Sequence, residues 1–163
     1  MKNIDEALRN VDMTYAQLVE VANEIVAKCT PKVDAILKKI NDVENLSNDT
    51  IRSVMLELSL AAYGFSEIKE KSAMKAECAE ILRKEKYAQQ FNLSSGAVAT
   101  KENTAMLSVS EEVLAETIFN LVASTLKVKL DEIHRVVDTL KSVIASRLAE
   151  AKLTAIADNG QES

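Results

Sequence analysis

The residues of this chain best suited to bind a ligand are basic and aromatic side chains between residues 71 and 91. On a helical wheel at 100° per residue, one sector of about 60° holds three lysines, Lys71, Lys75 and Lys86. Arg83 lies at the border of this sector. Tyr87 and Phe91 follow directly. Lysine and arginine meet phosphates and aromatic rings stack on bases, so this combination is typical of proteins that bind single-stranded nucleic acid.

The surrounding charge supports a second interpretation of the same stretch. Glu77, Glu80 and Glu85 lie among the basic residues, and a helix face with both signs of charge is usually just solvated. The whole chain carries 20 Lys and Arg against 25 Asp and Glu, for a net charge of −5. An acidic protein does not coat nucleic acid by its overall charge, so any binding to phosphate must be local.

Residues for catalysis or metal binding are scarce. His134 is the only histidine, and Asp131 and Asp138 lie three and four residues away, where neighbours on a helix form solvated ion pairs more often than a catalytic base. Cys29 and Cys78 are too few and too far apart for a zinc site, and we interpret both as small core residues. With no glycine-rich phosphate loop either, we expect no enzyme activity, no cofactor and no metal.

The composition predicts an all-α fold. One Pro and three Gly in 163 residues leave almost no room for the turns of a multistranded sheet. No run approaches the eighteen or so apolar residues of a membrane span, and the start at residues 1–5 carries acid where a signal peptide is basic and then apolar. We therefore expect a cytoplasmic protein without a membrane partner.

Apolar residues at alternating spacings of four and three predict helices in the first 46 residues. The pattern runs from Ile4 to Cys29 and resumes from Val33 to Val43. Thr30 and Pro31 form a helix-start signature between the two runs, so we expect a break near Pro31. This region is predicted as an N-terminal coiled-coil domain, residues 1–46.

A helical hairpin and a long C-terminal helix are predicted for residues 47–157. The first long helix follows the capping residues 46–49 and extends to about residue 92. Residues 92–108 are the best candidate for a mobile connection, with a short helical turn at 101–106. Ser108, three residues before Glu111, has the spacing of a capping box for the last helix. Residues 158–163 are predicted to be a disordered tail, with fraying from Thr154.

The last helix carries a wide apolar seam that predicts self-association. A face this broad requires more than one partner helix, and an open apolar face favours assembly. The predicted oligomerisation residues are Phe119, Leu126, Leu130, Ile133, Val137, Leu140 and Ile144.

Taken together, the hairpin, its basic stretch, the loop and the last helix resemble the UvsY-type recombination mediators of phages. The basic stretch is residues 81–87, and the loop is residues 94–96. The entry to the last helix, residues 106–114, resembles the family's Leu-Ser, acidic pair, Val-Leu pattern most closely. The resemblance covers roughly residues 60–145.

This resemblance implies a non-enzymatic ring-shaped homo-oligomer that binds single-stranded DNA in a phage-infected or prophage-bearing bacterial host. It also implies contacts with the single-strand binding protein and the recombinase, and assistance in loading the recombinase. Arg83, Lys84 and Lys86 match the family's DNA-contact stretch. The alternative from another class is a purely protein-binding helical module, such as a phage-encoded inhibitor of a host system or an assembly factor.

Overall fold

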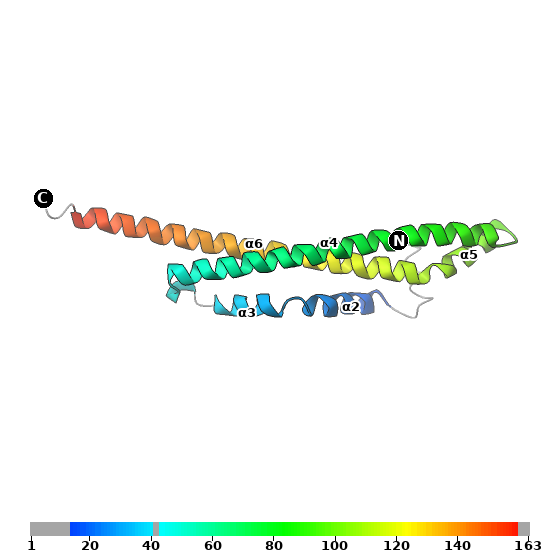
Figure 1. Cartoon of the computed structure of the whole chain (residues 1–163), viewed down its shortest axis with the longest axis horizontal. Coiled ribbons are helices and arrows are strands. Elements are labelled where there is room, and N and C mark those ends of the chain that lie inside the picture. The colour runs from blue at the N-terminus through cyan, green and yellow to red at the C-terminus, as the bar shows by residue number, and fades with distance from the viewer. Residues whose placement is uncertain (1–13, 41–42, 160–163) are drawn as a thin grey trace. The chain divides into compact units, whose positions relative to one another are not determined.

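The computed structural model describes residues 14–40 and 43–159 of the chain (Figure 1). Within these residues the fold is all-α, as predicted, and contains no strand. The helices are α2 (Tyr15–Ala27), α3 (Pro31–Lys39), the 3-10 helix η1 (Val43–Asn45), α4 (Asn48–Leu93), α5 (Val98–Ser108) and α6 (Ser110–Asn159). The predicted apolar positions from Ile4 to Val11 lie outside the described residues.

The N-terminal helices begin at recognisable caps. α2 begins after a capping box, in which the backbone N–H of Thr14 donates to the side chain of Gln17 at 2.7 Å and the Thr14 hydroxyl accepts from the Gln17 N–H. α3 begins with Pro31 at its first position, and three residues, 28–30, separate it from the end of α2. The first N–H groups of a helix have no partner within the helix, and proline has no N–H, so it is favoured at this position. The helix break therefore lies near Pro31, as predicted.

α4 starts and ends close to its predicted bounds. Ser47 caps its first turn, since the Ser47 hydroxyl accepts from the Thr50 N–H at 3.1 Å. The helix then continues for 46 residues and passes through Gly64 without a break. It ends before the short connection 94–97, in which Gly96 adopts a φ of 109° that is open to glycine but strained for other residues.

The structure corrects two predictions about the region before α6. Most of the predicted connection 92–108 is helical, because α5 fills residues 98–108. Ser108 is the last residue of α5 and does not cap α6, since its hydroxyl donates to the Ala105 carbonyl at 2.7 Å instead. α6 begins at Ser110, just after the buried Val109.

α6 also ends later than the sequence indicates. It remains helical through Thr154, where fraying was predicted, to Asn159, which lies inside the predicted tail 158–163. Residues 160–163 of that tail lie outside the described part of the chain.

The chain forms two compact units that differ from the predicted division at residue 46. Among the described residues, unit 1 comprises 14–29 and 66–128, and unit 2 comprises 30–40, 43–65 and 129–159. The predicted boundary separates the N-terminal helices from the hairpin, whereas in the structure α2 and α3 each join part of the hairpin. Both α4 and α6 contribute residues to both units.

The two units have cores of different character. In unit 1 the part of α4 that follows residue 65 buries only small side chains, Ser72, Ala76 and Ala79. Small residues allow another helix to approach closely. In unit 2 the first part of α4 buries larger residues, among them Ile51, Leu58 and Phe65.

Candidate functional site

Two of the predicted DNA-contact residues form ion pairs across unit 1. The Arg83 Nε donates to a carboxylate oxygen of Glu116 at 2.8 Å, and the Lys86 Nζ donates to Glu112 at 2.9 Å. From Arg83 to Lys86 the chain advances by three residues on α4, while their partners step back by four residues on α6, from Glu116 to Glu112. Opposite directions of this kind are expected for antiparallel helices. These cations therefore contribute to the packing of α4 on α6.

Lys71 and Lys84 pair with carboxylates on their own helix. Lys71 lies 2.5 Å from Glu67 and Lys84 lies 2.6 Å from Glu80, each one helical turn away. The hydrogen bond from each lysine, together with its positive charge, lowers the pKa of the partner glutamate below its ordinary value. Both lysines have exposed side chains.

The remaining predicted contact residues are engaged with aromatic rings. The Lys75 Nζ lies 5.1 Å from the centre of the Phe119 ring, a cation–π contact between α4 and α6. The rings of Tyr87 and Phe91 stack with 6.3 Å between centroids, and Lys101 lies over the Phe91 ring at 5.8 Å. All six predicted DNA-contact residues thus have a partner within the chain.

Most of the predicted oligomerisation seam of α6 is already buried within the single chain. Leu126 has no exposed surface, and the four seam residues from Leu130 to Leu140 are at most 8% exposed. Phe119 and Ile144 are partly buried. The seam is therefore not the open apolar face from which self-association was predicted, and a second subunit is not needed to cover these residues.

The candidate catalytic residues do not converge. His134 is exposed, and its neighbour Asp138 pairs with Lys141 at 2.8 Å. This hydrogen bond, with the lysine charge, lowers the pKa of Asp138. The two cysteines differ in burial. Cys29 is partly buried, and its thiol donates to the Ile25 carbonyl. Cys78 is exposed, so the prediction that it is a core residue is wrong.

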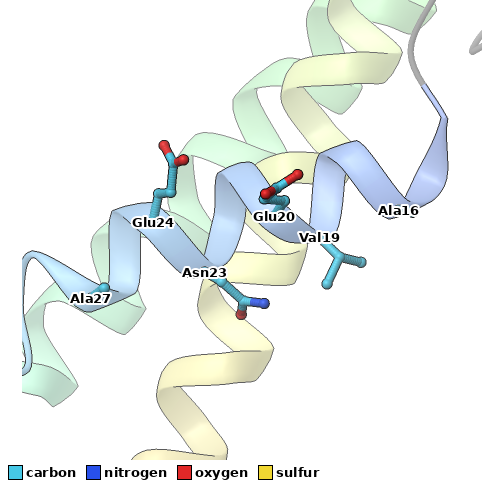
Figure 2. A pocket seen from close by; sticks show the side chains of 6 residues that line it. All are labelled: Ala16, Val19, Glu20, Asn23, Glu24 and Ala27. Atoms are coloured by element: carbon cyan, nitrogen blue, oxygen red, sulfur yellow. The ribbon is translucent and has the colours of Figure 1, made fainter.

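One hollow described by the structure lies along α2 in unit 1. Figure 2 shows that α2 alone lines it, with Ala16, Val19, Glu20, Asn23, Glu24 and Ala27. An active site needs groups that converge from several elements, and this hollow has none. Over residues 14–40 and 43–159 no three His, Cys, Asp or Glu residues gather in a way that could hold a metal ion. Nor does any described helix have the length and apolarity to cross a membrane.

Sequence reasoning missed a second apolar stripe on α4, on the side away from the core. Within unit 2 it consists of Leu56, Leu60 and Tyr63, and within unit 1 of Met74, Cys78 and Ile81, all exposed. Both sets follow the spacing of four and three that marks a helix seam. The signal is present in the sequence as a second set of apolar residues with this spacing.

Comparisons with protein families, with characterised proteins and with solved structures found no match to this chain. The resemblance to recombination mediators therefore rests on the sequence motifs alone.

Proposed function

We propose that this chain is a non-enzymatic, protein-binding helical module. The observation that carries the proposal is the pairing of Arg83 with Glu116 and of Lys86 with Glu112. The most basic stretch of the chain contributes to its own helix packing, while large apolar side chains stand in solvent on the outer face of α4.

The pairing weakens the case for a DNA surface for an energetic reason. A phosphate that took the place of Glu116 would leave this carboxylate, which is only 25% exposed, without its cation. An unpaired and partly buried charge is costly. Binding to single-stranded DNA would therefore have to offset the loss of interhelical contacts.

The outer face of α4 in unit 1 has the features of a helix-binding surface. Met74, Cys78 and Ile81 fall within a sector of about 60°, and all three are exposed. Glu85 lies in the same sector and Glu77 at its edge, and neither forms an ion pair in the described part of the chain. An amphipathic helix with basic flanks complements such a face.

Recombinase loading on single-stranded DNA, with the single-strand binding protein and the recombinase as partners, is the second proposal. It is supported by the exposure of the Lys71 and Lys84 side chains, at 67% and 66%. Water screens exposed ion pairs of this kind, so a phosphate would displace their carboxylates at little cost.

The two proposals are separated by fluorescence anisotropy at low salt. We expect a labelled single-stranded oligonucleotide to give a flat titration, since the interhelical cations are already paired. A steep, salt-dependent titration that is lost in the double variant Lys71→Glu and Lys84→Glu, with the helicity of the parent kept, would establish the DNA proposal instead.

A labelled synthetic amphipathic peptide with a leucine seam and lysine flanks tests the first proposal. It should bind the wild-type chain and lose at least about tenfold in affinity on the double change Met74→Glu and Ile81→Glu. The control Leu153→Glu, also at an exposed apolar position, should bind as the parent does. Equal binding by all three proteins, or by a scrambled peptide, would contradict the proposed surface.

A further inference from the structure

The first part of α4 exposes an apolar stripe in unit 2 that the protein-binding surface of unit 1 does not include. Leu56, Leu60 and Tyr63 are 63%, 66% and 78% exposed. Their spacing of four and three places them within a sector of about 60° on the helix. The buried residues of this segment, such as Val54, Leu58 and Phe65, lie on the opposite side. The stripe is therefore a second seam, separate from the core.

Gly64 lies beside this stripe in the middle of α4. A glycine destabilises a helix interior relative to alanine, so it usually serves a close approach of another backbone. A Cβ added to Gly64 would meet nothing within 4 Å. The described part of the chain thus gives no packing reason for a glycine here, whereas a second helix resting on the stripe would.

The charges around the stripe are already satisfied. Glu57 is the only charged residue between Ser53 and Gly64, and it pairs with Lys39 of α3 at 3.1 Å. Asp49 and Arg52, just before the segment, pair with each other at 3.3 Å. A helix docked on the stripe would therefore bury apolar and small polar residues without leaving a charge unpaired.

We infer that the segment from Leu56 to Gly64 is a homodimer interface, in which α4 packs antiparallel against α4 of a second copy about a two-fold axis at Leu60. In a two-fold interface, if a residue of one copy contacts a second residue of the other, the reverse contact is also made. Leu60 then lies against Leu60, and Leu56 lies against Gly64, where the missing side chain leaves room for the leucine.

The charges on α4 allow it to pair with a second copy at this stripe but oppose such a pair in unit 1. A two-fold pair that set Met74 against Ile81 would also set Glu70 against Glu85 and bring like charges together. The stripe in unit 2 has no such conflict. The inference goes beyond the proposed function, because it concerns other residues and another partner.

The interface consists of one short helix pair, so its size falls at the low end of specific interfaces, below about 1,200 Å² in total. We therefore expect a weak dimer, with a dissociation constant of about 1 µM to 1 mM. Sedimentation equilibrium across about this range of concentration should show the mass rise from one chain toward two.

Two variants test the interface without disturbing the monomer. Leu60→Glu changes an exposed side chain, and Gly64→Leu adds a side chain in open space, so both should keep the helicity of the parent. Each should weaken the dimer by at least about tenfold, the first by placing two carboxylates together and the second by filling the space opposite Gly64 that Leu56 of the other copy occupies. Leu153→Glu, at an exposed apolar position of α6, is the matched control and should dimerise as the parent does.

Three results would overturn the inference. They are a monomer mass at every concentration, a dimer that survives both α4 changes, and a dimer lost in the α6 control but kept in Leu60→Glu. None of them bears on peptide binding at Met74 and Ile81, so the failure of the dimer and the failure of the proposed function are distinguishable.

Discussion

The guanidinium of Arg147 on α6 donates a hydrogen bond to the backbone carbonyl of Leu46 at 2.6 Å, across 101 residues of sequence. The same side chain donates to the carbonyls of Val43 and Glu44 at 2.9 Å and to the Asn48 side chain at 3.3 Å. Arginine can do this because its planar group presents five donors in a fixed fork. One side chain thereby fixes η1 and the start of α4 on α6 within unit 2.

We expect Arg147→Ala to destabilise the chain by about 2–4 kcal/mol, since it leaves several partly buried carbonyls without a donor. Arg147→Lys should recover only part of the loss, because an ammonium cannot reproduce the fork. Urea denaturation followed by circular dichroism measures both. Arg135→Ala, at an exposed position of the same helix, is the control and should change stability by less than about 0.5 kcal/mol. A similar loss in both alanine variants would contradict the role given to Arg147.

The burial of the α6 seam predicts a fold defect and not an assembly defect. Leu126→Ala should cost about 2–5 kcal/mol, as is usual for a buried leucine. Thermal unfolding gives the measurement, and Val128→Ala is the control because Val128 is 57% exposed on the same helix. Light scattering should show the same mass for Leu126→Ala and the parent. A normal melting temperature together with an altered mass would indicate that the seam forms the interface between subunits predicted from the sequence.

The pair of Arg83 and Glu116 should show measurable coupling in a double-mutant cycle. Both side chains are less than one-third exposed, so we expect a coupling free energy of about 1 kcal/mol between the two alanine changes. The cycle for Lys84 and Glu80, which are more exposed and lie on one helix, is the comparison and should give a smaller coupling because water screens the pair. If the interhelical coupling were no larger than the comparison, the basic stretch would be free for other partners.

The lowered pKa of Glu80 predicts a small pH dependence of stability. Because the folded pKa lies below the unfolded one, the contribution of the pair with Lys84 is present above the ordinary glutamate pKa and is lost as pH falls through the folded value. The melting temperature of the parent should therefore exceed that of Glu80→Gln at pH 7, and the two should converge as the pH falls below the folded pKa of Glu80. Glu77→Gln, at an exposed position without an ion pair among the described residues, should differ little at either pH.

The helices were predictable from the sequence because their apolar period is local. The spacing from Ile51 to Phe65 identifies the core side of α4 in unit 2, and the seam from Leu126 to Leu140 identifies that of α6. A period reveals which side is covered, but it carries no information about which helix covers it. The seam of α6 alone therefore cannot distinguish cover by this chain from cover by a second copy, whereas the structure shows these residues already buried within the single chain.

The candidate site was less predictable because pairing depends on register between helices. The wheel positions of Arg83 and Lys86 follow from the sequence alone. The partner of Lys86, Glu112, lies 26 residues away, and the partner of Arg83, Glu116, lies 33 residues away. These ion pairs form only because the connection 94–97 and α5 set the register of α6 against α4. Glu112 was interpreted as part of a helix start, and nothing local indicates its role in an interhelical pair.

The order of the segments has a consequence during synthesis of the chain. Unit 1 has all its residues once Val128 has left the ribosome, whereas residues 30–65 of unit 2 must wait for the segment from Lys129 onward. The stretch from Val33 to Phe65 therefore emerges with apolar side chains whose partner on α6 has not yet been translated. Chains in this state expose hydrophobic surface and are candidates for chaperone binding or aggregation, and release of the last helix ends this period.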